Sequence, residues 1–271
     1  MKQILIAFDG NNFSKGAMDM AVQINQLVPI HITGAFIPQV DYRKLWNFSG
    51  ADPGIAAPMI GSEHSAEVEQ NIKTFENICE QHRIKYSIKK DYLGFALPEL
   101  KKETRFNDVL FLGGESFFSS HGDDMNDYIR EALNQSECPI LVIPEDFLFP
   151  RSIILAYDGT ASSVYAIKQF AYLFPELCNQ SALLVYSDDK GEGIPDQEDI
   201  ALLSSLHFPN LQLIKLDADP EKEFKEWISE KRRSLLVTGS FGRGLFSQLF
   251  RKSFVSEILQ QHLLPVFIAH K

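Results

Sequence analysis

The chain has 271 residues, of which 45% are hydrophobic and 23% are charged, and these proportions exclude disordered, collagen-like and disulfide-rich proteins. The net charge of −10 argues against nucleic acid as a partner, because a negative field repels phosphate backbones. No apolar run reaches the roughly 18 residues that cross a membrane, and the N-terminus is typical of a strand and not of a signal peptide. The three cysteines form no C-x-x-C pair. We therefore expect a cytoplasmic globular protein with no membrane contact.

The first half of the chain alternates short apolar runs with helical patterns. The helix expected at 66–81 has apolar Val68, Ile72, Phe75 and Cys79 at the spacing of one helix stripe. Short runs of this kind between helices indicate parallel strands that are covered on both faces, which is the α/β class. The predicted elements are, in chain order, a strand at 4–8, a helix at 14–27, a strand at 30–37, the helix at 66–81, and strands at 86–91, 109–112 and 140–143.

An internal repeat sets the number of domains. Three segments recur, namely 3–10 as 152–159, 109–113 as 235–239, and 137–143 as 263–269. The first match has an offset of 149 residues and the other two have an offset of 126, so the second copy is 23 residues shorter. The sequence therefore predicts two tandem, doubly wound, five-stranded domains at residues 1–146 and 150–271.

Ligands of such sheets bind beyond the carboxyl ends of the strands, where the strand order reverses. In the second half, one strand is followed by Asp158-Gly159-Thr160, and Asp158 is either a hydrogen-bond acceptor for a nucleoside or a turn residue that caps a helix. A later strand leads into Gly239-Ser-Phe-Gly242-Arg243-Gly244, followed by Arg251, Lys252 and Ser253. Glycines before a helix form an anion site with their N–H groups, although a flexible connection has the same composition.

Together these residues resemble the universal stress protein family in order and spacing. The matching features are the D-G-x-x-x-S start at Asp158, the G-x-x-G-x9 loop that ends at Ser253, and the final Pro265-Val-Phe-Ile strand. The resemblance implies a Rossmann-like strand order of 3-2-1-4-5 and pairing between the fifth strands, so that the two halves form an internal pseudo-dimer.

The resemblance also implies a site for ATP or a related adenine nucleotide, with Mg²⁺ accompanying ATP. Asp158, with Gly159 and Thr160, would contact the nucleoside, and a main-chain group near Tyr186 would meet adenine. Gly239, Gly242 and Ser253 would hold phosphate, with Arg243 beside them. Lys252 departs from the family pattern, which has glycine there; its side chain either crowds a phosphate or binds it.

The first copy has lost this pattern, and we interpret it as a degenerate site. No G-x-x-G follows residue 112, and Glu115, Asp123, Asp124 and Asp127 place negative charge where phosphates would lie. Residues 1–149 carry 13 basic and 21 acidic side chains, whereas residues 150–271 carry 13 and 15. The extra segment at 38–63 is either a lid or partner-docking segment or a surface loop.

The expected function is that of a stress-response regulator that binds an adenine nucleotide in its second half. The sequence offers no identifiable catalytic residue and no metal-ligand spacing, so little or no hydrolysis is expected, with a slow ATPase as a weaker option. The alternative is a scaffold that binds no nucleotide and docks an unknown protein partner. A homodimer is compatible with either reading.

Overall fold

The computed structural model describes residues 1–9, 12–37, 65–89, 96–115, 135–187, 193–216, 227–228, 230–239, 258–259 and 262–269. The elements of the first half are β1 (Lys2–Asp9), α1 (Lys15–Leu27), β2 (Ile30–Ile37), α4 (Ser65–Gln81), β3 (Lys85–Lys89), α5 (Ala96–Thr104), β4 (Val109–Gly113) and β5 (Ile140–Ile143). Those of the second half are β6 (Ser152–Ala156), α8 (Ala161–Leu173), the 3-10 helix η1 (Pro175–Leu177), β7 (Ser181–Ser187), α9 (Gln197–His207), β8 (Leu211–Leu216), β9 (Ser234–Gly239) and β10 (Val266–Ala269). The predicted segment at 38–63 and the acidic residues 123, 124 and 127 lie outside the described residues.

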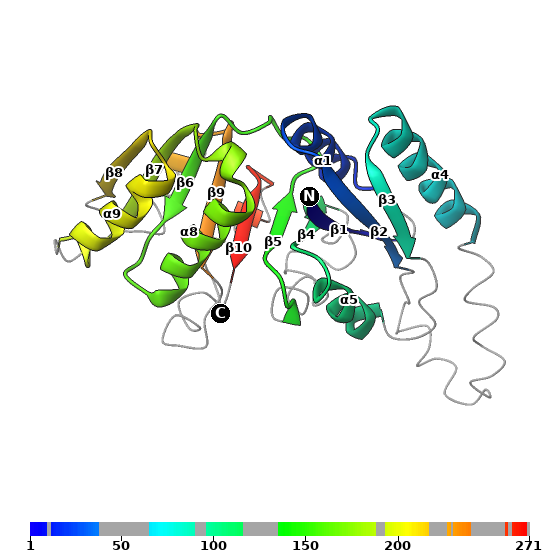
Figure 1. Ribbon diagram of the computed structural model, residues 1–271, viewed down its shortest axis with the longest axis horizontal. Coiled ribbons are helices and arrows are strands. Elements are labelled where there is room, and N and C mark those ends of the chain that lie inside the picture. The colour runs from blue at the N-terminus through cyan, green and yellow to red at the C-terminus, as the bar shows by residue number, and fades with distance from the viewer. Residues whose placement is uncertain are drawn as a thin grey trace.

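The ten strands form one continuous sheet in the order β3-β2-β1-β4-β5-β10-β9-β6-β7-β8 (Figure 1). Each half therefore has the predicted order 3-2-1-4-5, and all pairs within a half are parallel. The halves meet where β5 and β10 pair antiparallel, with Leu141 opposite Phe267. The predicted pairing of the fifth strands is thus confirmed, and it merges the two predicted sheets into one. The domain boundary predicted at 146–150 falls between β5 and β6 and stays a prediction.

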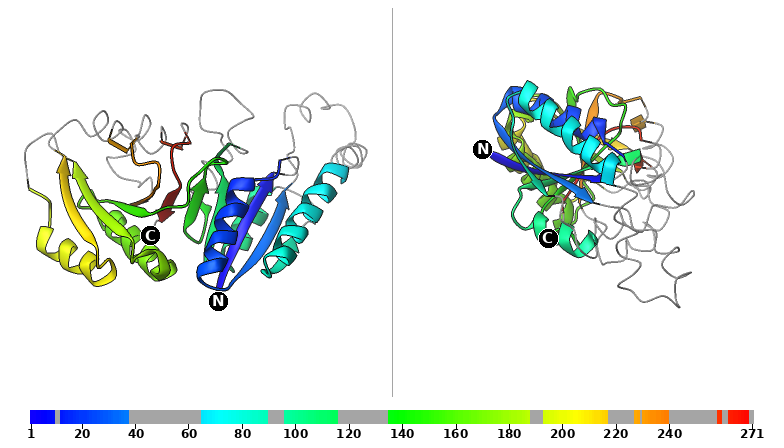
Figure 2. Two further views of the ribbon diagram at one scale, coloured as in Figure 1. Left: turned by 90° about the horizontal axis from the view of Figure 1, so that it is seen from above. Right: turned by 90° about the vertical axis from the view of Figure 1, so that its right-hand side faces the viewer.

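The two faces of the sheet form two separate apolar layers. Along β1, Ile4, Ile6 and Phe8 belong to the layer beneath α1, α4, α8 and α9, whereas Leu5 and Ala7 belong to the layer on the side of α5. Figure 2 shows α1 and α4 covering one face of the first half of the sheet. Because β4, β5 and β10 are buried along their whole length, they read in sequence as continuous apolar runs without alternation.

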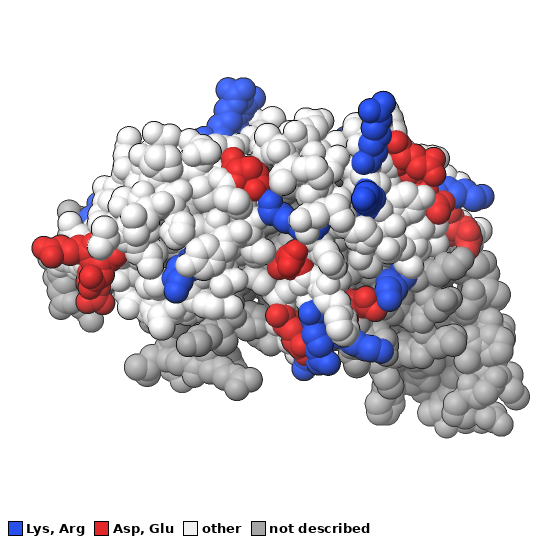
Figure 3. All heavy atoms as spheres, in the orientation of Figure 1, with Lys and Arg blue, Asp and Glu red and all other residues white. Residues whose placement is uncertain are grey.

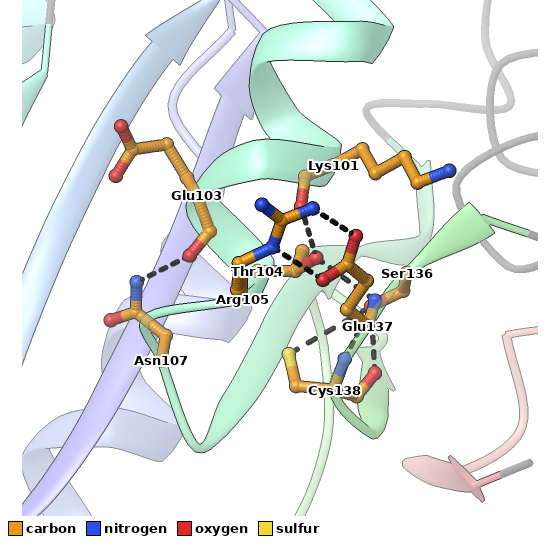
Figure 4. Close-up of polar contacts among 8 residues, drawn as sticks. All are labelled: Lys101, Glu103, Thr104, Arg105, Asn107, Ser136, Glu137 and Cys138. Atoms are coloured by element: carbon orange, nitrogen blue, oxygen red, sulfur yellow. Dashed lines mark hydrogen bonds and ion pairs between the residues drawn. The ribbon is translucent and has the colours of Figure 1, made fainter. Parts of the chain in front are cut away.

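A polar cluster at the amino ends of β4 and β5 fixes the approach to the central strand pair (Figure 4). The Arg105 guanidinium donates two hydrogen bonds to the Glu137 carboxylate, from Nε at 2.7 Å and from Nη2 at 2.8 Å. The Glu137 backbone N–H donates to Thr104 Oγ1 at 3.0 Å, and Ser136 Oγ donates to the Cys138 carbonyl at 2.6 Å. These contacts tie the end of α5 to the turn that enters β5. The hydrogen bond from Arg105 lowers the pKa of Glu137 below its ordinary value of 4.5.

A first prediction concerns the acid stability of this pair. Because the folded pKa of Glu137 is lowered, its stabilisation is fully present above the unfolded pKa and is lost as the pH falls through the folded value. We expect the difference in melting temperature between wild type and Glu137→Gln, measured by circular dichroism, to be largest near pH 7 and to shrink below about pH 4. Arg105→Gln should behave in the same way, and a difference independent of pH would contradict the assignment.

A second prediction concerns the three cysteines, Cys79, Cys138 and Cys178. All are buried, and burial raises the pKa of each thiol to about 12. Since the thiolate is the reactive form, we expect no labelling by a disulfide reagent at pH 8 in the folded protein. All three thiols should react once urea unfolds the chain. Rapid labelling of any of them in the native protein would show that its layer opens to solvent.

Candidate functional site

The candidate site lies at the carboxyl end of β6, where the strand order of the second half reverses. β6 pairs with β7 on one side and with β9 on the other. Asp158, Gly159 and Thr160 follow β6 after one intervening residue, Tyr186 is near the end of β7, and Gly239 ends β9. The structure therefore brings these five predicted residues to one edge of the sheet. The other predicted residues, Gly242, Arg243, Lys252 and Ser253, lie outside the described part of the chain.

Asp158 and Thr160 build the turn that starts α8. Asp158 Oδ1 accepts hydrogen bonds from the Thr160 N–H at 2.9 Å and from Thr160 Oγ1 at 2.6 Å. Thr160 is the N-cap of α8, and its Oγ1 accepts from the Ser163 N–H at 3.3 Å. Gly159 has a φ of 78°, a conformation that favours glycine. Asp158 therefore has the turn role, which was one of its two expected roles, and its contact with a nucleoside stays a prediction.

Gly239 is required for close packing of β9 against α8. A Cβ atom at this residue would lie 2.7 Å from the Ser162 carbonyl carbon and 2.8 Å from the Ser163 nitrogen. The structure places the first turn of α8 beside this glycine, and its expected contact with phosphate stays a prediction. The chain that leaves β9 consequently begins beside a helix N-terminus, whose N–H groups and dipole favour anions.

Two tyrosines line the neighbouring part of the edge. Tyr157 and Tyr186 are almost fully buried, and their ring centroids lie 6.4 Å apart. The Tyr157 hydroxyl donates a hydrogen bond to the Pro195 carbonyl at 2.9 Å, and the Pro195 ring lies 3.1 Å from the position of a Cβ at Gly159. Burial raises the pKa of Tyr157, with smaller contributions from the carboxylates of Asp196, Asp158 and Asp199. The segment before α9 is therefore fastened over the turn after β6.

The matched edge of the first half is filled by phenylalanine rings. Phe8, which matches Tyr157 in the repeat, stacks on Phe13 at 4.9 Å and on Phe36 at 4.8 Å between ring centroids. Phe75 of α4 packs edge-on against Phe8 at 5.8 Å. These rings form one apolar cluster where the second half has two tyrosines beside carboxylates. The change from Phe8 to Tyr157 was visible in the repeat, but its partner Pro195 was not.

Sequence reasoning missed Glu145, which occupies the N-terminus of α1. Ser14 Oγ donates to Glu145 Oε1 at 2.8 Å, and the Gly16 N–H donates to Glu145 Oε2 at 2.8 Å. The Glu145 backbone N–H in turn donates to Glu115 Oε2 at 2.8 Å. A carboxylate of the chain therefore takes the place of an external anion at this helix end. The repeat offers one sequence signal for this difference. At the offset of 126 residues, the position of Glu145 in the first copy corresponds to Lys271 in the second, which lies outside the described residues.

The two halves also differ in where their first helix begins. In the repeat, Ser14 matches Ser163, yet Ser14 is the N-cap of α1 whereas Ser163 lies inside α8. A Cβ at Gly113 would overlap the Ser14 side chain and lie 3.1 Å from Glu145 Oε1. The end of β4 therefore packs against the start of α1 as closely as Gly239 packs against α8. The first turn of α8 has no counterpart in α1, and the Glu145 carboxylate satisfies the exposed helix end instead.

Other expectations concern metals and membranes. Among the described residues, no group of three His, Cys, Asp or Glu side chains is arranged to hold a metal ion. No helix within the described ranges has the length and apolarity needed to cross a bilayer.

Comparison with solved structures shows that the chain has the fold of tandem universal stress proteins. It matches a universal stress protein from Archaeoglobus fulgidus DSM 4304 with a TM-score of 0.76 at 15% identity, over 100% of this chain and 96% of that chain. A functionally unknown protein from Pseudomonas aeruginosa PAO1 matches with a TM-score of 0.56 at 11% identity, over 100% and 92%. The cytoplasmic domain of a prokaryotic cation chloride cotransporter matches with 0.52 at 11% identity, over 98% and 94%. No family model and no curated protein matches the sequence.

A third prediction tests the role of Glu145. Glu145→Ala removes the acceptor of two hydrogen bonds at the start of α1, and losing such an N-terminal acceptor costs about 1–2 kcal/mol of the free energy of unfolding. Urea denaturation followed by circular dichroism measures this change. The matched control is Asp146→Ala, because Asp146 is exposed and adjacent, and it should stay within about 0.5 kcal/mol of wild type. Equal effects of the two substitutions would contradict the assigned role.

Proposed function

We propose that the chain is a tandem universal stress protein that binds an adenine nucleotide, as its Mg²⁺ complex, in the second half alone. The observation that carries this proposal is the difference between the two helix N-termini. In the first half, Glu145 accepts the hydrogen bonds that a phosphate would accept from Ser14 and Gly16. A second negative group at that place would be repelled by the carboxylate. The first half is therefore closed to phosphate by its own residue.

The second half has the charges that a phosphate needs. The chain after Gly239, which lies beside the first turn of α8, carries Arg243, Arg251 and Lys252 in its sequence. Guanidinium and ammonium groups next to a helix N-terminus bind phosphate by charge and by hydrogen bonds. We assign the phosphates to this loop, with Gly242 and Ser253 as further donors.

The nucleoside belongs at the other end of the edge, by Asp158 and Tyr186. The turn after β6 leaves Asp158 exposed, so that its carboxylate is accessible to ribose hydroxyls. The carboxylates of Asp158, Asp196 and Asp199, which raise the pKa of Tyr157, also make this end negative. A free nucleotide adds further negative charge, and Mg²⁺ neutralises part of it, so we expect the Mg²⁺ complex to bind better. No residue of the site is assigned as a nucleophile or general base, and we expect slow or no hydrolysis.

A scaffold without nucleotide is the second candidate function. It is favoured by the engagement of Asp158 Oδ1 with Thr160, since this carboxylate already serves the turn. Lys252, where the family pattern has glycine, favours it as well. Universal-stress-like folds also occur as the cytoplasmic domain of a cotransporter, so the fold by itself does not assign a function.

A fourth prediction separates the two candidates. Isothermal titration of the wild type with ATP and Mg²⁺ should give one site per chain, with weaker binding when Mg²⁺ is omitted. Gly242→Val should abolish binding, because a branched side chain blocks close approach of the loop to phosphate. The matched control is Ser116→Val, which is the same position of the first copy, and it should bind as wild type does. A wild type that binds no nucleotide at about millimolar concentration favours the scaffold.

A further inference from the structure

A short segment of the second half lies across the turn that follows β6. It consists of Gly193, Ile194, Pro195 and Asp196, which we call the strap, and it leads directly into α9. The Pro195 ring covers Gly159, because its Cβ and Cγ atoms each lie 3.1 Å from the position of a Cβ at that residue. Gly159 is one of the residues predicted to contact a nucleoside. The strap therefore covers part of the candidate site.

One hydrogen bond and one apolar contact hold the strap in this position. The buried Tyr157 side chain donates a hydrogen bond from its hydroxyl to the Pro195 carbonyl at 2.9 Å, and we call this bond the latch. Ile194 packs against the apolar layer that contains Tyr157. A hydrogen bond between neutral groups contributes only modestly to stability. A segment held by one such bond can open without unfolding of the sheet.

Both ends of the strap have the properties of a hinge. Gly193 is exposed, and a Cβ placed on it would meet no atom of the described residues within 4 Å. Asp196 has a φ of 46°, in the left-handed region that is unfavourable for a residue with a side chain, and it makes no capping hydrogen bond to α9. Rotation at these two residues would move Ile194 and Pro195 away from the turn after β6.

Like charges oppose the closed position of the strap. Burial raises the pKa of Tyr157, and the carboxylates of Asp196, Asp158 and Asp199 add to the increase, so these carboxylates lie near the latch. All three carboxylates belong to exposed residues, and Figure 3 shows acidic side chains gathered over α9. Closing the strap brings Asp196 towards Asp158, and their repulsion offsets part of the stabilisation by the latch.

The first half provides an internal comparison for the latch. Phe8 matches Tyr157 in the repeat and has no hydroxyl, and its ring stacks on Phe13 and Phe36 instead. The hydroxyl is thus present in the half to which we assign the nucleotide. It is absent at the same place in the half whose helix N-terminus Glu145 occupies. This distribution associates the latch with the ligand and not with the fold that both halves share.

We propose that the strap is a gate over the nucleoside end of the second-half site, and that Tyr157 is the positioning residue that holds it closed. The gate rests on the nucleotide site proposed above. In the closed state, which the structure shows, Pro195 denies a ligand contact with Gly159. When the latch breaks, the strap moves away and the turn after β6 becomes accessible. Nucleotide then enters at a rate that is proportional to the open fraction of the strap.

Hydrogen exchange of the nucleotide-free chain tests the latch. The Ile200 N–H donates to the Asp196 carbonyl at 3.0 Å, and it loses this acceptor when Asp196 rotates. Tyr157→Phe should raise the exchange rate of the Ile200 amide about fivefold, because it removes one hydrogen bond from the closed state alone. The matched control is Tyr165→Phe, which removes the same atom from a half-buried tyrosine of α8 on the same apolar layer, and it should exchange as the wild type does.

Binding kinetics test the gate. Surface plasmon resonance with Mg²⁺–ATP over the immobilised full chain should give an association rate constant about fivefold higher for Tyr157→Phe than for the wild type. The dissociation rate constant should stay unchanged, whereas a residue that only supports the fold of the site would raise it on substitution. Tyr165→Phe should leave both rate constants unchanged. Circular dichroism melting checks that each variant is folded.

Each part of the proposal has its own contrary result. An exchange rate at Ile200 that Tyr157→Phe leaves unchanged, or that Tyr165→Phe raises equally, would overturn the latch. Faster exchange without faster association would overturn the gate. If neither the wild type nor Tyr157→Phe binds Mg²⁺–ATP, the proposed function fails and the gating of a nucleotide fails with it. The exchange experiment distinguishes this case, because it reports on the latch without any ligand.

Discussion

The antiparallel pairing of β5 with β10 determines the shape of the whole molecule. Three residue pairs connect the strands, and both strands are buried along their entire length. Each domain alone would expose this strand as an apolar edge, which is prone to pair with other chains. Joining the two edges inside one chain removes them both. It also places the second domain in a fixed relation to the first, with the edge strands β3 and β8 at opposite ends (Figure 1).

This central contact also involves two carboxylates of the first half, Glu115 and Glu145. His262, just before β10, has its Nδ1 3.7 Å from Glu115 Oε1, and Glu115 in turn accepts the hydrogen bond from the Glu145 backbone. A Cβ at Gly114 would lie 2.9 Å from the same Nδ1. These carboxylates at the start of α1 therefore lie beside the strand pair that joins the two halves. Glu145 caps the start of α1 next to this junction, because it accepts the hydrogen bonds of Ser14 and Gly16.

The fold was predictable because its signals are local and repeated. Apolar runs such as 109–112 and 140–143 identify buried parallel strands without any knowledge of their neighbours, and the repeat shows each run twice. The strand order was predicted from the resemblance to the universal stress protein family. The site was only partly predictable. Asp158, Gly159 and Thr160 were found because turn residues follow a strand directly, whereas the contacts of Glu145 join residues about 130 positions apart. The packing of Gly239 against α8 was not predictable for the same reason, since this helix is far away in the sequence, and its contact with phosphate stays a prediction.

Lys85 and Lys89 of β3 have a consequence for assembly beyond their own strand. A molecule whose two edge strands could both pair with other copies would add chains without limit and form a fibre. The Lys85 ammonium group opposes strand pairing at this edge, whereas Lys89 forms an ion pair with Glu103 at 3.2 Å. The sheet is then protected against edge-to-edge growth at its first-half end. Replacing Lys85 with an apolar residue would remove this protection and leave β3 open to pairing with another chain.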